Sequence, residues 1–181
     1  IQKVDIYKYA VLWQFGGIYL DLDIAIHRPF DNEFYNLIRD NEVVFSQMSV
    51  YSILPLRVVN NGIIIANVPK SPVFLDIISK IPWEKAAYKN KDWAILETTG
   101  PFQLSRSLAN NPGVLILDQK YLEGRPLVPW FGNSEGIYIT HLHHSNWMEG
   151  WVYLWILCLK YIVALALVGL CILFLKFKNF K

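Results

Sequence analysis

The chain has 181 residues, of which 54% are hydrophobic and 18% charged, and its net charge is +2. This length suits a single domain, and the apolar fraction excludes a disordered tail or a charge-rich nucleic-acid arm. The only charged residues after position 150 are four lysines, so residues 1–150 together carry a charge of −2. Nucleic-acid binding requires clustered basic residues, so we predict no nucleic-acid partner.

Cysteine usage and the first residue say little about the compartment. The two cysteines, Cys158 and Cys171, lie in the C-terminal apolar segment, and no CxxC or zinc-finger spacing is present. The chain opens at Ile1, without an initiator methionine or a signal peptide. We therefore expect a fragment whose N-terminal part is missing.

The predicted elements of residues 1–150 alternate between helix and strand. Val4, Tyr7, Val11 and Phe15, with Leu12, recur at helical spacing, and Gly16-Gly17 predicts the end of that helix. Residues 18–24 alternate in residue type and predict a strand. We expect further strands at 43–48, 62–66, 114–117 and 137–140, and helices at about 31–39, 72–80 and 101–109. This alternation predicts an open sheet of the α/β class.

The C-terminal residues form one long apolar segment. From Trp151 to Leu175, 23 of 25 residues are apolar, the exceptions being Lys160 and Gly169. A helix of about 20 apolar residues spans a bilayer, so we predict a transmembrane helix at residues 151–175. The basic tail 176–181 favours the cytoplasmic side, which places residues 1–150 on the lumenal side.

Lys160 leaves the start of the span open. A lysine at the centre of a membrane helix is costly, so the span starts near Lys160 in one reading, with residues 151–159 in the interface. The alternative is a buried helix of a soluble protein, although such a helix is seldom apolar on all faces.

The chemistry concentrates at two carboxylates. Asp21 and Asp23 are two residues apart on the predicted strand, so both side chains are expected on the same face. Paired carboxylates suit a hard divalent ion that also binds a diphosphate. Two solvated loop aspartates are the alternative. Asp5 and Lys8 share a face of the preceding helix that is expected near the end of the strand.

The run from Asp5 through Lys8, Gly16-Gly17 and Tyr19 to Asp21-Leu22-Asp23 resembles the signature of glycosyltransferases with a sugar-binding DXD motif, as in family 32. That group includes fungal α-1,6-mannosyltransferases, the catalytic subunits of mannosyl-inositol-phosphorylceramide synthase and, more distantly, the large clostridial glucosylating toxins. The resemblance continues through Asn60-Asn61-Gly62, Gly100-Pro101, His141 and Trp147. It implies that residues 1–150 form a catalytic domain with a GT-A-like open mixed sheet flanked by helices, with its N-terminal part missing.

The resemblance also implies roles for single residues. Asp5, Asp21 and Asp23 correspond to catalytic residues, and Asp21, Asp23 and His141 to metal ligands, with His143 and His144 as alternatives to His141. The implied donor-binding residues are Asp5, Lys8, Gly17, Tyr19, Asp21, Asn61 and Trp147. Lys8 stands where the family usually has arginine, and it would act as a point charge. Asn60 is an alternative to Asn61, and the two with Gly62 could form only a turn. Lys8 could be a solvated helix residue, and Trp147 an interfacial anchor.

The implied activity is a retaining, metal-dependent hexosyl transfer. We expect Mn²⁺ or Mg²⁺ as the cofactor, GDP-mannose as the favoured donor and inositol phosphorylceramide, or a similar glycolipid, as the acceptor. The expected location is the Golgi or ER membrane, and a regulatory subunit is a conceivable partner. Alternatives are a hexosyltransferase that builds protein-linked glycans and a catalytically silent membrane scaffold. The region that normally holds the nucleotide base lies upstream of Ile1, so this fragment alone is predicted to be inactive and poorly folded.

Overall fold

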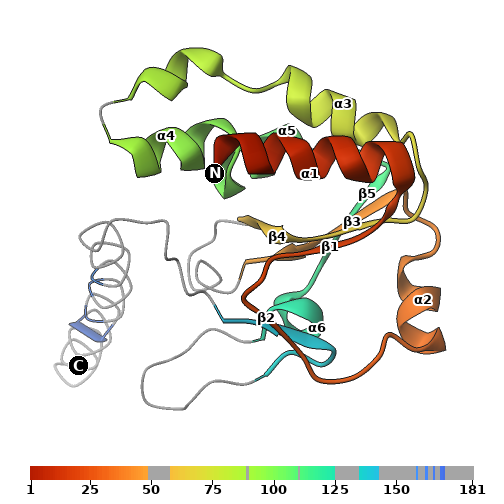
Figure 1. The fold of residues 1–181 in the computed structure, drawn as a ribbon. Coiled ribbons are helices and arrows are strands. Elements are labelled where there is room, and N and C mark those ends of the chain that lie inside the picture. The colour runs from red at the N-terminus through yellow and green to blue at the C-terminus, as the bar shows by residue number, and fades with distance from the viewer. Residues whose placement is uncertain are drawn as a thin grey trace, which may run out of the picture. The chain divides into compact units, whose positions relative to one another are not determined.

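The computed structural model describes residues 1–48, 58–88, 90–109, 111–124 and 135–142, and in addition residues 158, 162, 165, 168 and 169. The chain divides into two compact units, Ile1–His144 and Ser145–Lys181. The helices and strands below belong to the first unit (Figure 1).

Helices and strands are interspersed along the first unit, as the sequence predicts, but they do not alternate strictly. The helices are α1 (Gln2–Phe15), α2 (Asn32–Ile38), α3 (Pro72–Ser79), the 3₁₀ helix η2 (Trp83–Ala87), α4 (Lys91–Thr98), α5 (Pro101–Ser107) and α6 (Gln119–Leu122). The strands are β1 (Gly17–Leu20), β2 (Ile24–Ile26), β3 (Val43–Gln47), β4 (Val59–Ala66), β5 (Val114–Leu117) and β6 (Ile139–His141). Four of these elements, β2, η2, α4 and α6, were not predicted.

Four strands form a mixed sheet in the order β1-β4-β3-β5. Strand β4 is antiparallel to both of its neighbours, whereas β3 and β5 are parallel. Strands β2 and β6 form a separate antiparallel ladder. Figure 1 shows α1, α3, α4 and α5 on one side of the mixed sheet, and α2, α6 and the small ladder on the other. The predicted mixed sheet flanked by helices is therefore confirmed.

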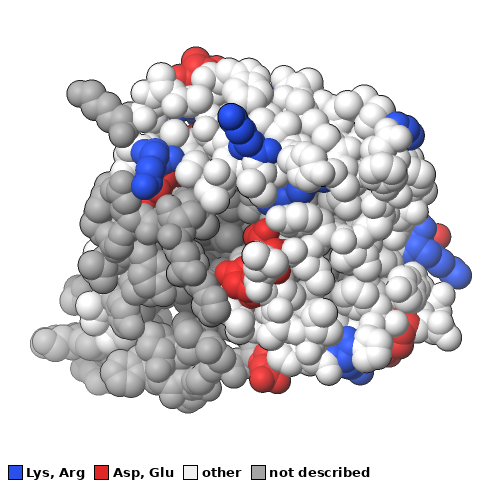
Figure 2. Space-filling view, viewed as in Figure 1, with Lys and Arg blue, Asp and Glu red and all other residues white. Residues whose placement is uncertain are grey.

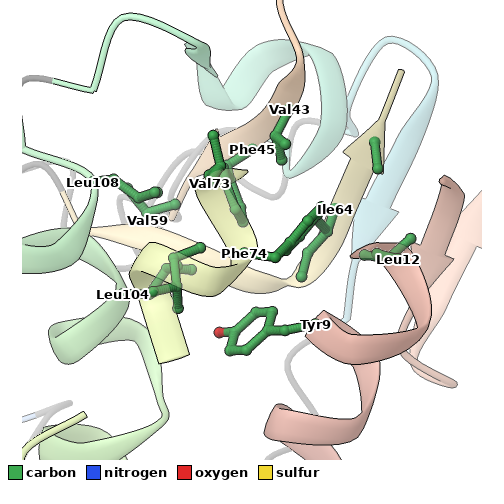
Figure 3. Close-up of a cluster of buried hydrophobic side chains, with 12 residues drawn as sticks. Tyr9, Leu12, Val43, Phe45, Val59, Ile64, Val73, Phe74, Leu104 and Leu108 are labelled. Carbon is green, nitrogen blue, oxygen red and sulfur yellow. The ribbon is translucent and has the colours of Figure 1, made fainter. Parts of the chain in front are cut away.

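The two faces of the sheet build two hydrophobic clusters, because successive side chains of a strand point to opposite faces. Val43, Phe45 and Ile64 face α1, α3 and α5, as Figure 3 shows. Val44, Ile63 and Ile65 face the other way. The second cluster includes Phe34 and Ile38 of α2, Leu122 of α6, Ile139 of β6 and Tyr138.

Side-chain caps mark the starts of two of the predicted helices. Asp31 Oδ1 accepts a hydrogen bond of 2.9 Å from the backbone N–H of Phe34 at the start of α2. Ser71 Oγ accepts one of 3.3 Å from the N–H of Val73, with Pro72 at the first helical position of α3. Gly16 ends α1 with a φ of +67°, a conformation that glycine adopts at little cost.

Helix α1 does not bury the apolar face that its sequence pattern predicts. Val4, Tyr7 and Phe15 are 52%, 70% and 74% exposed, whereas Asp5 and Lys8 are 3% and 4% exposed. Tyr9 and Leu12 supply the apolar contacts of the buried face. The polar pair turns inward because it has partners there, described below, and burial of unpartnered charges would be costly.

The predicted strand 18–24 is wrong in its second half. Strand β1 ends at Leu20, and residues 21–23 form a turn before β2. The Asp21 N–H still donates to the Gly62 carbonyl over 2.8 Å, and Leu22 is then fully exposed. The break lets both carboxylates leave the apolar interior, where two unpartnered charges would be costly. Asn60, Asn61 and Gly62 are not a turn; they lie inside β4.

The predicted span at 151–175 and the tail at 176–181 lie outside the described residues, apart from five isolated positions. Those five, Cys158, Ile162, Leu165, Val168 and Gly169, are helical and exposed. Among the described residues, no helix combines the length and the apolar character needed to cross a bilayer. The domain boundary at residue 150 and the membrane span remain predictions.

Candidate active site

Two acidic side chains and a histidine meet where β1 ends. One ligand atom from each of Asp21, Asp23 and His141 lies within 4.8 Å of the other two. His141 Nε2 is 3.2 Å from Asp23 Oδ1. The β2–β6 ladder brings this about, since its register places His141 opposite Ile24, the residue after Asp23. The predicted metal ligands, far apart in sequence, therefore converge.

Asp21 is held by Tyr19 and by the close approach of Gly62. The Tyr19 hydroxyl donates to Asp21 Oδ1 over 2.7 Å. Burial raises the pKa of Tyr19, and the hydrogen bond to Asp21 and the nearby negative charges raise it further, so the phenol stays a donor. A Cβ at position 62 would come within 2.5 Å of Asp21 Oδ2. Only glycine leaves room for this carboxylate.

An irregularity in β4 places Asn60 beside the cluster of Asp21, Asp23 and His141. The β3–β4 register shifts between Phe45, which pairs with Ile64, and Ser46, which pairs with Asn60. Asn60 Oδ1 accepts a hydrogen bond of 2.6 Å from the Gly62 N–H within this irregular stretch. The shift turns Asn60 toward His141, whose Nδ1 is 2.8 Å from Asn60 Nδ2.

A second polar cluster forms around Asp5. Lys8 Nζ lies 2.8 Å from Asp5 Oδ1, and Asn61 Nδ2 donates to the same oxygen over 3.1 Å. Thr99 Oγ1 donates to Asp5 Oδ2 over 2.7 Å, and Tyr9 donates its hydroxyl proton to the Thr99 carbonyl over 3.3 Å. Lys8 is buried, so the alternative of a solvated helix residue is wrong.

The Asp5 cluster and the carboxylates adjoin through Tyr19. Lys8 Nζ lies 5.1 Å from the centre of the Tyr19 ring, within the range of a cation–π contact, while the hydroxyl of that ring binds Asp21. In Figure 2, acidic side chains gather near the middle of the face, with basic side chains above them. A buried cation therefore stands beside a carboxylate pair, an arrangement that suits a ligand carrying both phosphate and hydroxyl groups.

The electrostatics of His141 reflect its acidic neighbours. Burial lowers the pKa of His141, but the hydrogen bond and charge of Glu123, with the charges of Asp23 and Asp21, outweigh burial and raise it. Three carboxylates around one imidazole form a strongly negative site, which attracts a cation.

The predicted site residues fall into four groups. Asp21, Asp23 and His141 converge at one cluster, and Asp5, Lys8, Tyr19 and Asn61 lie in or beside the adjoining one. Gly17 stands at the opposite end of β1, paired with Ala66, and is not brought to either cluster. Trp147, His143 and His144 lie outside the described residues.

Sequence reasoning missed three contributors to the site. Thr99 precedes the predicted Gly100-Pro101 helix start, which was a usable signal for its neighbourhood. Gly62 was noted only as part of a motif, without its contact to Asp21. Glu123, whose side chain is fully buried against His141, carried no signal in the sequence.

Comparisons with known proteins bear on this geometry. Residues 1–45 match the family described as "Glycosyltransferase sugar-binding region containing DXD motif". The chain is 24% identical over 181 residues to Inositol phosphoceramide mannosyltransferase 1 of Schizosaccharomyces pombe, a match that covers 95% of this chain and 52% of that protein. It is 24% identical over 189 residues to Inositol phosphoceramide mannosyltransferase 2 of the same organism, covering 97% and 48%. The resemblance to the DXD glycosyltransferases is confirmed.

The match to the DXD glycosyltransferases falls on the residues that build the site. Residues 1–45 include Asp5, Lys8, Tyr19, Asp21 and Asp23. The chain spans about half the length of the curated relatives that it matches. Together the matches support a glycosyltransferase.

Proposed function

We propose that the protein is a metal-dependent, retaining hexosyltransferase that transfers mannose from GDP-mannose to a membrane acceptor. The single observation that carries this proposal is the convergence of Asp21, Asp23 and His141 within 4.8 Å, beside a buried Lys8–Asp5 pair. Three aligned ligand groups next to a buried cation match what a nucleotide diphosphate sugar requires: a metal for the phosphates and polar groups for the hydroxyls.

The side chains present fit a divalent ion. Two carboxylates and one imidazole are a donor set that Mn²⁺ accepts, and Mg²⁺ accepts the carboxylates. Asp21, Asp23 and His141 would hold such an ion, which would supply positive charge to the diphosphate of the leaving group. Tyr19 holds Asp21 by its hydroxyl, and the β2–β6 ladder holds His141 opposite Ile24 and so beside Asp23, which means that the chain itself fixes the three ligand groups.

The Asp5 cluster is proposed to orient the donor sugar. Asp5 Oδ1 already pairs with the Lys8 ammonium and accepts a hydrogen bond from Asn61, and Oδ2 accepts one from Thr99. A carboxylate has about four acceptor positions, so one position on Oδ2 remains for a sugar hydroxyl. Asp5 would thus bind the sugar through one oxygen while its other contacts hold Lys8 and Asn61 in place. Trp147 is proposed as a further donor contact.

The acceptor is proposed to be inositol phosphorylceramide, used at the Golgi membrane. The names of the two fungal relatives support this acceptor, and both are mannosyltransferases by name. The apolar segment 151–175 supports a site near a bilayer. The basic residues 176–181 support a cytoplasmic tail and a lumenal catalytic domain.

The test is a lipid analysis in host cells that lack their own inositol-phosphorylceramide mannosyltransferase. Mass spectrometry of lipids from cells expressing the full-length protein should find inositol phosphorylceramide with one added hexose. Asp23→Asn should abolish the product at unchanged expression, because it removes the charge of a metal ligand. Asp40→Asn is the matched control, since the side chain of Asp40 is 86% exposed and lies 3.8 Å from the side chain of the neighbouring Arg39.

The outcomes separate the parts of the proposal. A hexosylated lipid with the wild type and with Asp40→Asn, but not with Asp23→Asn, supports reaction class and acceptor together. Transfer by wild type to glycans instead of the lipid would move the acceptor to protein-linked glycans. Full activity of Asp23→Asn would overturn the metal assignment, and failure of the wild type to bind any GDP- or UDP-sugar with Mn²⁺ would favour a silent scaffold.

A further inference from the structure

Glu123 is a buried carboxylate whose position calls for an explanation. It follows helix α6 as its C-cap residue, and its side chain has no solvent exposure. Burying a carboxylate is costly unless it meets a cation or hydrogen-bond donors. Its Oε1 lies 3.4 Å from His141 Nδ1, on the side of the imidazole ring away from Asp23.

The two ring nitrogens of His141 therefore face different partners. Nε2 points to Asp23 over 3.2 Å, toward the cluster of Asp21, Asp23 and His141. Nδ1 faces Glu123 and also Asn60 Nδ2 at 2.8 Å. The amide of Asn60 is oriented by the Gly62 N–H, which donates to Asn60 Oδ1, so that its NH₂ group faces the histidine.

These two neighbours of Nδ1 favour different tautomers. Asn60 Nδ2 can only donate, so it stabilises the tautomer whose proton is on Nε2, pointing at Asp23. The Glu123 carboxylate can only accept, so it stabilises the tautomer whose proton is on Nδ1. The Asn60 contact is the shorter of the two, so it favours the Nε2–H tautomer while no cation is bound. Only the Nδ1–H tautomer, which Glu123 stabilises, leaves the Nε2 lone pair free for a cation.

We infer that Glu123 is the positioning residue of the metal site: it accepts the Nδ1 proton of His141 and so presents the Nε2 lone pair to a divalent cation. This inference rests on the proposed metal-dependent function. Carboxylate groups behind a ligating histidine fix its orientation and raise its basicity, and removing them typically lowers metal affinity about 10- to 100-fold. Glu123 acts through His141 and touches neither the donor nor the metal.

The test measures Mn²⁺ binding rather than turnover. The free Mn²⁺ signal in electron paramagnetic resonance gives the dissociation constant for the purified full-length protein. Glu123→Gln keeps the shape of the side chain and removes its charge, and it should weaken Mn²⁺ binding about 10-fold or more. Glu42→Gln is the control. Glu42 also accepts a hydrogen bond, from Ser71, but it precedes β3 at the end of the strand where Val43 pairs with Ala66, away from His141.

A double-mutant cycle distinguishes positioning from a general loosening of the fold. In a His141→Asn background, Glu123→Gln should have no further effect on Mn²⁺ affinity, because its effect passes through the histidine. Circular dichroism and thermal unfolding check that each variant is folded.

Each result has a definite meaning. Wild-type affinity in Glu123→Gln would overturn the inference, as would an equal loss with and without His141. If the wild type binds Mn²⁺ and Asp23→Asn does not, while Glu123→Gln is unaffected, only the role of Glu123 fails. If the wild type binds no Mn²⁺ at all, the proposed metal-dependent function fails and the inference fails with it.

Discussion

The carboxylate of Asp21 lies directly against the Cα of Gly62, in the space that a Cβ would need. An added Cβ would stand 2.5 Å from Asp21 Oδ2 and 3.1 Å from Asn60 Oδ1. Real Cβ atoms do not approach oxygen this closely, so any side chain at position 62 must displace the Asp21 carboxylate or the strand. The irregular stretch of β4 thus fixes where the Asp21 carboxylate can lie.

Gly62→Ala should abolish most of the transferase activity. Displacing a ligand group by about 1 Å can cost on the order of 100-fold in rate, and Asp21 has no room to move sideways without losing Tyr19. Initial rates of hexose transfer measure this loss. Gly113→Ala is the control, because its Cβ would meet the Glu42 side chain at 3.3 Å, which can move away. A wild-type rate in Gly62→Ala would contradict the assigned position of Asp21.

The local elements of the fold could be predicted, and the irregular part of the site could not. Helix α3 is preceded by Ser71 and begins at Pro72, and α1 ends before Gly16, so short-range chemistry marks those boundaries. The turn at residues 21–23 escapes this reasoning. Its cause is a change of partner between distant strands: β1 pairs with β4 as far as Leu20 and Ile63, and Ile24 already pairs with His141 of β6.

The candidate site was likewise predictable in part. The carboxylates of the DXD motif are visible in the sequence because they are two residues apart. The contact from Thr99 to Asp5 joins residues 94 positions apart, and that from Glu123 to His141 joins residues 18 apart. Such contacts arise where α4 packs against α5 and η2 and where α6 packs against β3 and β6, and α4 and α6 were themselves not predicted. Residue type alone therefore identified the candidate metal ligands but not the side chains that hold them in place.

Replacement of Lys8 should reveal the cost of leaving Asp5 without its cation. Lys8→Met keeps the apolar stem but removes the ammonium, and breaking a buried pair costs about 3–5 kcal/mol. We expect the lower end, since Asn61 and Thr99 still donate to Asp5. Urea unfolding of the purified protein measures the loss.

Lys8→Arg is the matched variant, because it keeps the charge and restores the residue type usual in the resembled family. It should retain the stability and at least the activity of the wild type. Equal destabilisation by methionine and arginine would mean that the side-chain volume matters at this position and the charge does not.

Glu97 should contribute to acid sensitivity. Burial raises the pKa of Glu97, but hydrogen bonds and charges from Lys85 and Arg106 outweigh it and lower the pKa below the ordinary 4.5. The stabilisation is therefore complete above about pH 4.5 and is lost as the pH falls through the folded-state pKa. Glu97→Gln should make the unfolding free energy depend less on pH below about pH 4.5. Glu84→Gln, an exposed change on η2, should leave that dependence unchanged.

Thr99→Val should weaken donor binding more than it slows the chemical step. The valine keeps the buried volume but removes the hydroxyl that donates to Asp5 Oδ2, the oxygen that we propose binds the sugar. A hydrogen bond to a charged group is worth about 1.5–3 kcal/mol, so we expect KM for the donor to rise about 10-fold with a smaller change in kcat. Thr98→Val is the control, since the equally buried Thr98 hydroxyl donates to the Ala94 carbonyl of its own helix. Similar kinetics for the two valine variants would show that Asp5 keeps its orientation without Thr99.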